Sequence, residues 1–123
     1  RRNRKMVGGG MRQAGVIAAA GIVALETMIE RLADDHAHAR YLAESLADLP
    51  GIDLEPARVK TNLVFFELTG NITAPQMEER LAREGVLVGA TGGKRIRAVT
   101  HYGIERADID AVIDAIKSVM SEH

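Results

Sequence analysis

Residues 62–77, NLVFFELTGNITAPQM, contain a strand, a turn and the start of a helix in that order. The apolar run at the beginning, residues 62–68, is rich in residue types that favour strands, and the Gly-Asn pair after it is typical of turns. Thr73 is followed three residues later by Gln76, which is the spacing of a capping box. The sequence therefore predicts a strand followed by a helix that runs from about residue 74 to residue 84.

Beyond this helix, short strands alternate with glycine-rich connections. Val86-Leu87-Val88 predicts a strand, and residues 89–93 predict a flexible hairpin connection, because they lack the spacing of a phosphate-binding loop and precede a strand. In that strand, Arg95–His101, Ile96 and Ala98 share one face and the arginines share the other. The closing helix carries an apolar stripe made of Ile109, Val112, Ile113, Ile116, Val119 and Met120.

On the N-terminal side, the chain contains two helical stretches of different character. Residues 14–24 are apolar on nearly every face and have small side chains, which is typical of a helix buried on most sides. From Leu25 the apolar residues recur at spacings of three and four, which predicts an amphipathic helix that ends at Pro50-Gly51. A short strand is expected around residues 52–54. The resulting order predicts an α+β fold with a long N-terminal helix, in which helices pack on one face of a mainly antiparallel sheet.

The composition limits the classes of protein to which the chain can belong. Sixteen basic and seventeen acidic residues give a formal charge of −1, which argues against a general nucleic-acid-binding surface. The absence of cysteine excludes disulfides and cysteine-bound zinc, and it fits a cytoplasmic protein. The longest apolar run, residues 14–25, is shorter than the roughly 20 residues that a membrane-spanning helix needs. Neither nucleic acid nor a membrane is therefore expected as a partner.

Two basic regions are candidate binding sites. Lys5 and Arg12 flank the triple glycine that precedes the apolar helix, so both cations and the free helix amides could reach one phosphate or carboxylate. The alternative is a solvated basic terminus. Arg97 lies in the middle of a strand, where its guanidinium either grips a carboxylate with two hydrogen bonds or faces solvent. No metal site is expected, because His36 and His38 point to different faces of a helix.

Four segments of the chain resemble the low-specificity L-threonine aldolases, which are pyridoxal-phosphate lyases with the fold type of aspartate aminotransferase (fold type I). In the order that they have in that family, the segments are Arg4–Gly15 with Ala18–Gly21, Arg31–Ala37, Thr61-Asn62 and Ile96–His101. The resemblance covers essentially the whole chain but only the C-terminal third of such an enzyme. It implies a homo-oligomeric, cytoplasmic enzyme that cleaves threonine-type and allo-threonine-type β-hydroxy-α-amino acids to glycine and an aldehyde.

The resemblance also implies roles for the candidate residues. In the family, the arginine that matches Arg97 binds the α-carboxylate of the amino-acid substrate, and the positions that match Lys5 and Arg12 lie near the phosphate end of the cofactor, at a subunit boundary. The Schiff-base lysine, the histidine that stacks on the cofactor ring and the acid that pairs with the pyridine nitrogen all lie upstream of this region. This chain is therefore expected to contain no catalytic residue, to be inactive alone, and to bind pyridoxal phosphate weakly or not at all.

Under this hypothesis, residues 1–25 are the tail of a large cofactor domain, with an anion-binding loop and a buried helix, and residues 26–123 are the small C-terminal domain. The remaining N-terminal part of the enzyme is then a partner, together with the amino-acid substrate. The alternative hypothesis is a non-catalytic α+β module that oligomerises or binds a small anion. The environment of the apolar helix distinguishes the two, because a stand-alone domain must bury this helix, whereas a fragment must expose it or associate through it.

Overall fold

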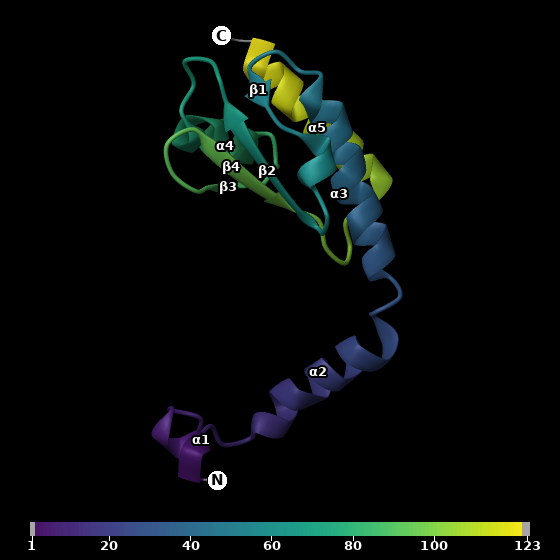
Figure 1. Ribbon diagram of the computed structural model, residues 1–123, viewed down its shortest axis with the longest axis vertical. Helices are drawn as coiled ribbons and strands as arrows, with labels where there is room; N and C mark the ends of the chain where they lie inside the picture. Colours follow the sequence, from purple (N-terminus) through teal and green to yellow (C-terminus); the bar gives the residue numbers. More distant parts are fainter. Residues whose placement is uncertain (1, 122–123) are drawn as a thin grey trace. The chain divides into compact units, whose positions relative to one another are not determined.

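The computed structural model describes residues 2–121, and the chain divides into two compact units. The first unit is Arg1–Arg31 and the second is Leu32–His123. Figure 1 shows that the first is built from helices, whereas the second combines a sheet with helices. Within residues 2–121, every helix is too short or too polar to cross a membrane.

The N-terminal unit consists of two helices, α1 (Arg2–Met6) and α2 (Ala14–Thr27). As the sequence predicts, α2 is made almost entirely of apolar and small residues, yet none of its residues is buried. Its large side chains are more than half exposed: Val16, Ile17, Ile22, Val23 and Leu25. Because a helix that is apolar on every face is stable in water only when it is covered, α2 needs a covering surface that its own unit does not supply.

The C-terminal unit is a four-stranded antiparallel sheet with three α-helices (Figure 1). The strands lie in the order β1-β2-β4-β3 and every neighbouring pair is antiparallel. Their bounds are β1 Ile52–Asp53, β2 Leu63–Leu68, β3 Gly89–Ala90 and β4 Arg95–Val99. The helices are α3 (Leu32–Ala47), α4 (Ala74–Arg83) and α5 (Arg106–Ser121), and a short 3-10 helix, η1 (Pro56–Arg58), lies between β1 and β2.

One face of the sheet carries the core of this unit. Along β2 and β4, Val64, Phe66, Leu68, Ile96 and Ala98 are buried, and the residues between them are exposed or half-buried. The buried side chains pack with apolar residues of all three helices, among them Leu42, Leu46, Met77, Leu81, Ile109 and Ile116. The predicted α+β arrangement, with helices on one face of an antiparallel sheet, is therefore confirmed, and the other face stays open.

The predicted amphipathic helix from Leu25 to Leu49 is wrong in its bounds. The structure has two helices there, with a break between Thr27 and Leu32. The Thr27 hydroxyl donates to the Val23 carbonyl at 2.7 Å, a side-chain bond that competes with the regular helix pattern. The acidic first turn of α3, with Asp34 and Asp35, favours a new helix N-terminus at this point.

The predicted strand over residues 86–88 is also wrong, and β3 begins three residues later than predicted, at Gly89. The Val86 amide donates to the Leu81 carbonyl at 2.8 Å, and Gly85 has a positive φ of 80°. These are the features of a helix C-terminus closed by a left-handed glycine. The backbone of Val86 therefore ends α4 instead of pairing in the sheet. The hairpin connection predicted over residues 89–93 is too long: Gly89 and Ala90 pair with β4 as β3, and only residues 91–94 connect the two strands.

The capping box at the start of α4 is confirmed. The Thr73 amide donates to Gln76 Oε1 at 2.9 Å, and the Gln76 amide donates to Thr73 Oγ1 at 3.5 Å. Replacing Thr73 with alanine removes the acceptor for a helix amide and is expected to lower the free energy of unfolding by about 1 kcal/mol. Urea unfolding followed by circular dichroism measures the change. Thr73→Ser keeps the hydroxyl and should lower the free energy of unfolding much less. An equal loss of stability in both variants would contradict the capping role.

Candidate functional site

Arg97 lies at the centre of the open face of the sheet. It is the middle residue of β4, with Phe65 of β2 opposite it on one side and Gly89 of β3 opposite it on the other. Its neighbours along the strand, Ile96 and Ala98, are buried on the core face, so the strand cannot rotate to turn Arg97 inward. The guanidinium is therefore carried by a rigid element and remains exposed.

The side chain of Arg97 lies over β3, where the absence of a side chain leaves room for it. A Cβ built at Gly89 would lie 3.7 Å from Nη2 and 4.0 Å from Nε of Arg97. Among residues 2–121, Arg97 has no ion pair and its side chain has no hydrogen bond. A rigidly held guanidinium without a partner is well suited to binding a carboxylate through two parallel hydrogen bonds.

Arg95 provides a contrast on the same face of the same strand. Its Nε lies 4.0 Å from Glu67 Oε1, and its guanidinium lies over the Phe65 ring at 4.6 Å from the centroid. The side chain is still 53% exposed. Arg95 therefore leans toward β2 and already has partners there, whereas Arg97 leans toward β3 and has none.

Three of the segments that carry the resemblance meet at one end of this unit. The Asn62 side-chain amide donates to the Thr100 carbonyl at 2.7 Å, so the residue before β2 is tied to the residue after β4. The buried Thr100 hydroxyl donates to the Asp35 carbonyl in the first turn of α3, also at 2.7 Å. These residues fix the ends of the two central strands and thereby the strand that holds Arg97.

The triple glycine of the N-terminal unit does not form the predicted cradle for an anion. The Gly8 amide donates to the Lys5 carbonyl at 3.2 Å, and the Gly9 amide donates to the Arg4 carbonyl at 2.7 Å. Gly8 has a positive φ of 85°, and a Cβ at Gly9 would lie 2.7 Å from the Arg4 side chain. The glycines therefore close the C-terminus of α1, a helix that the sequence did not predict, and the amides of Gly8 and Gly9 are occupied by backbone carbonyls.

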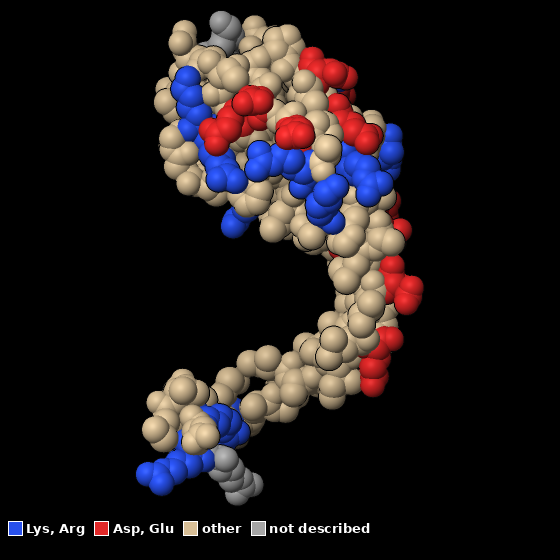
Figure 2. All heavy atoms as spheres, in the orientation of Figure 1, with Lys and Arg blue, Asp and Glu red and all other residues tan. Residues whose placement is uncertain are grey.

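Other groups in this unit remain suited to an anion. Lys5 and Arg12 are exposed, and neither has an ion pair among the described residues. Gln13 precedes α2 without a side-chain cap, and the first amides of that helix, Ala14 and Gly15, have no acceptor among residues 2–121. Figure 2 shows Lys and Arg gathered at α1, next to the largely uncharged surface of α2. Lys5, Arg12 and these two amides are donors of the kinds that bind phosphate, whereas the amides of Gly8 and Gly9 do not contribute.

The four lysines lie on the surface, whereas the described histidines differ in burial, and the buried Nδ1 of His38 has no hydrogen-bond partner among the described residues. Lys5, Lys60, Lys94 and Lys117 are all exposed, whereas a lysine that forms a Schiff base has to be shielded from water. His36 and His38 are half-buried on α3, and His101 is exposed just after β4. His123 lies outside the described residues. Within residues 2–121, no group of three or more His, Asp or Glu side chains is placed to hold a metal ion.

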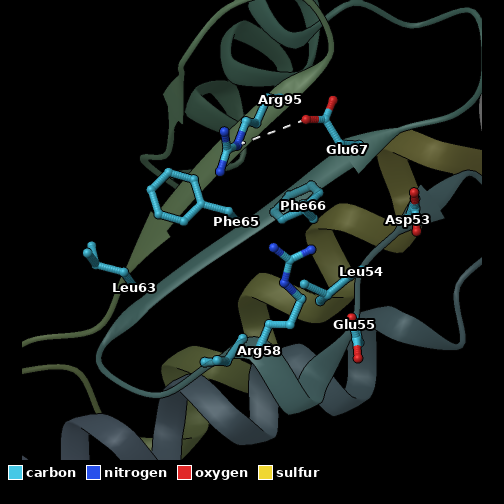
Figure 3. A pocket seen from close by; sticks show the side chains of 10 residues that line it. Asp53, Leu54, Glu55, Arg58, Leu63, Phe65, Phe66, Glu67 and Arg95 are labelled. Atoms are coloured by element: carbon cyan, nitrogen blue, oxygen red, sulfur yellow. Dashed lines mark ion pairs between the residues drawn. The ribbon is translucent and has the colours of Figure 1, made fainter.

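A pocket of about 550 Å³ lies beside β2, and sequence analysis did not predict it. Figure 3 shows Arg58 of η1 reaching into it toward β2, while Arg95 and Glu67 face each other at the other side. Its walls are formed by Asp53, Leu54, Glu55, Arg58, Val59, Leu63, Phe65, Phe66, Glu67 and Arg95. A local signal for the turn beside this pocket is Pro56, which suits the first turn of η1.

Comparison with known proteins identifies the family. The family model described as beta-eliminating lyase matches residues 1–69, which is more than half of the chain. The chain belongs to the beta-eliminating lyase family. The resemblance to the low-specificity threonine aldolases is confirmed as well, because several lyases of that name are 36–40% identical to most of this chain.

Two of these relatives illustrate how much of the lyase the chain represents. The low-specificity L-threonine aldolase 1 of Arabidopsis thaliana is 36% identical over 119 residues, which are 95% of this chain and 33% of the relative. The low specificity L-threonine aldolase of Escherichia coli is 40% identical over 109 residues, which are 89% of this chain and 31% of the relative. The chain thus spans about one third of the length of these lyases.

A solved structure supports the fold of this chain. A cysteine desulfurase from Escherichia coli superposes with a TM-score of 0.71 at 20% sequence identity, over 94% of this chain and 32% of that one. At this identity the likeness shows the fold alone. The expected fold, that of pyridoxal-phosphate enzymes of fold type I, is confirmed by this likeness.

Proposed function

We propose that this chain is the C-terminal portion of an enzyme that cleaves threonine-type β-hydroxy-α-amino acids to glycine and an aldehyde. One observation carries the proposal: Arg97 is held on a rigid strand, is exposed, and has no partner within the described residues. The names of the relatives, which are threonine aldolases, supply the reaction class. In this proposal the enzyme is a cytoplasmic homo-oligomer.

Arg97 binds the α-carboxylate of the substrate in this proposal. Two parallel hydrogen bonds from one guanidinium fix the orientation of the carboxylate as well as its position. Because the strand is anchored by Asn62 and Thr100, this orientation is set before the substrate arrives. Fixing the carboxylate selects which bond of the α-carbon is aligned for cleavage. Pyridoxal phosphate, when bound, stabilises the negative charge that cleavage leaves on this carbon.

Lys5 and Arg12 bind the phosphate end of the cofactor in this proposal. Their positive charges and the free amides of Ala14 and Gly15 form a donor set that suits a phosphate dianion. The assignment of residues 1–25 to a large cofactor domain is part of the same proposal. The exposed apolar surface of α2 supports it, because such a helix needs a covering domain.

The remaining two thirds of the enzyme supply the reacting groups in this proposal. None of the four lysines is buried, which supports placing the lysine that anchors the cofactor outside this chain. The chain alone is then inactive and binds pyridoxal phosphate weakly at best. Both the proposal and the non-catalytic alternative predict that the isolated chain is inactive. Only the proposal predicts that the complete protein containing this chain is an active enzyme.

The isolated chain is expected to form no specific complex with pyridoxal phosphate. The 123-residue chain mixed with the cofactor should show no protein-bound absorbance band near about 400 nm, because no lysine is shielded from water. It should also release no glycine from L-threonine. The Escherichia coli relative, treated in the same way, serves as the positive control for both measurements.

Borohydride reduction and peptide mapping make this test specific. Slow labelling spread over the four exposed lysines is the expected background. A strong band that disappears in Lys5→Ala, together with labelling confined to Lys5, would show that the cofactor anchor lies in this chain and that the proposal is wrong on this point.

A further inference from the structure

The edge of β2 that faces the pocket is only partly covered. β1 pairs with β2 at two positions, Ile52 with Leu68 and Asp53 with Glu67. If the ladder continued, Glu55 would pair with Phe65 and Ala57 with Leu63. The chain instead leaves the sheet after Asp53 and turns into η1, where Pro56 occupies a first-turn position that its fixed φ suits. The first half of β2 therefore has a neighbouring strand on the β4 side only.

The hydrogen-bond register shows which backbone groups this leaves without partners. The Leu68 amide donates to the Lys94 carbonyl, and the Thr100 amide donates to the Asn62 carbonyl, so the even-numbered residues of β2 face β4. Because the direction alternates along an antiparallel strand, Leu63 and Phe65 direct their backbone groups toward the pocket. The Leu63 amide donates weakly to Thr61 Oγ1 at 3.4 Å. The Phe65 amide and carbonyl have no partner among residues 2–121.

Unpaired strand backbone beside a pocket is complementary to one kind of ligand. An amide donor and a carbonyl acceptor at the same strand residue are matched by the carbonyl and amide of another extended chain. The free edge from Leu63 to Phe65 spans about 7 Å, enough for a ladder of two or three hydrogen bonds. A small anion or sugar would satisfy the guanidinium groups but not this alternating edge.

The side chains at the pocket add a preference for charge. Arg58 has no ion pair within the described residues, and Figure 3 shows its guanidinium directed into the pocket. Arg95 lies over the Phe65 ring at 4.6 Å, on the open face. A peptide residue paired with Phe65 would direct its side chain to the same face, near Arg95. Three acids also line the pocket: Glu67 faces Arg95, Asp53 pairs with Glu67 in the β1–β2 ladder, and Glu55 lies just before η1.

We propose that this pocket is a docking site for an extended peptide segment of a partner protein, which adds a strand to the free edge of β2 and places a carboxylate side chain next to Arg95 and Arg58. The backbone ladder supplies the affinity, and the two arginines select an acidic residue at the position paired with Phe65. This docking site is separate from Arg97, which leans toward β3 and is assigned to the substrate carboxylate. The docking proposal does not depend on the proposed function.

The experiment uses the whole 123-residue chain labelled with ¹⁵N and a blocked peptide, acetyl-TVEVT-amide. We expect the amide resonances of Phe65 and Leu63 to shift on titration, with a Kd on the order of 1 mM. Hydrogen exchange at the Phe65 amide should slow. The matched peptide with an N-methylated glutamate lacks the amide that pairs with the Phe65 carbonyl and should not bind. The glutamine peptide, acetyl-TVQVT-amide, should bind roughly 5-fold to 10-fold more weakly.

Variants of the chain test the same contacts by changing the protein instead of the peptide. Arg58→Gln should weaken binding of the glutamate peptide roughly 5-fold to 10-fold and leave the affinity for the glutamine peptide unchanged. Phe65→Ala keeps the free backbone amide, so this variant should still bind the peptide. Phe65→Pro removes that amide without removing a hydrogen bond to β4, so this variant should not bind the peptide. If Phe65→Pro fails to fold, the N-methylated peptide tests the same hydrogen-bond ladder.

Three results would overturn the proposal. Binding that survives N-methylation would show a carboxylate site without strand pairing. The absence of any shift at peptide concentrations of about 5 mM would exclude a docking site of useful affinity. Protection of the Phe65 amide that rises with protein concentration alone would show that a second copy of the chain covers this edge.

Discussion

Replacing Arg97 with alanine in the complete enzyme that contains this chain is expected to lower kcat/KM for L-threonine about 100-fold to 1000-fold. The variant loses two charge-assisted hydrogen bonds to the substrate carboxylate, and each tenfold loss corresponds to about 1.4 kcal/mol. Most of the loss should be a higher KM, with a further loss in kcat because the substrate is no longer oriented. Steady-state kinetics of glycine formation measure both.

Arg95→Ala is the matched control for this prediction. Arg95 lies on the same strand and the same face two residues away, but it leans toward Glu67 and Phe65. Its removal should change kcat/KM by no more than about 3-fold. Arg97→Lys keeps the charge without the fork of two donors, so it should fall between wild type and Arg97→Ala. Equal losses in Arg95→Ala and Arg97→Ala would contradict the assignment of the carboxylate to Arg97.

Replacing Phe66 with alanine is expected to lower the free energy of unfolding by about 3–5 kcal/mol. Phe66 is 1% exposed at the centre of the core between the sheet and the helices. Its removal loses buried apolar surface and leaves a cavity that the surrounding strands and helices cannot fill by small movements. Since small domains are stable by about 5–15 kcal/mol, the variant should be close to unfolding. Urea unfolding followed by circular dichroism measures the effect.

The adjacent residue provides a control with the same side chain. Phe65 points to the open face, is only half-buried, and contacts Arg95. Phe65→Ala should lower the free energy of unfolding by about 1 kcal/mol, mainly through loss of the cation–π contact and partial packing. Similar losses in the two variants would mean that the two faces of β2 are equally covered, which would contradict the open face described above.

Features that depend on local sequence were predicted well. The alternation of apolar and polar residues in β4 fixed which face Arg97 occupies, because successive side chains of a strand point to opposite faces. Thr73 and Gln76 identified the start of α4, since a capping box involves only residues three apart. The apolar stripe of α5 identified the face that is buried.

Predictions failed where one local pattern allows two backbone arrangements. The triple glycine is compatible with an anion-binding loop and with a helix C-terminus, and the short helix α1 before it decides for the second. Residues 86–88 have strand-type side chains, but Gly85 closes α4 and uses the Val86 amide to do so. The apolar spacing of three and four residues after Leu25 continues across the break between α2 and α3. The spacing therefore predicted one helix, because it contains no information on where the backbone hydrogen bonds stop.

The sequence by itself determined the α+β class, the order of most of its elements, and the outward position of Arg97, because these follow from residue periodicity and from bonds between near neighbours. Only the tertiary structure decided that Arg97 leans over Gly89 without a partner while Arg95 is occupied, and that a free edge of β2 lies beside Arg58. These features join residues that are between 5 and 30 positions apart in the chain. Their contacts depend on strand register and on where β1 leaves the sheet, and neither is a property of any single segment.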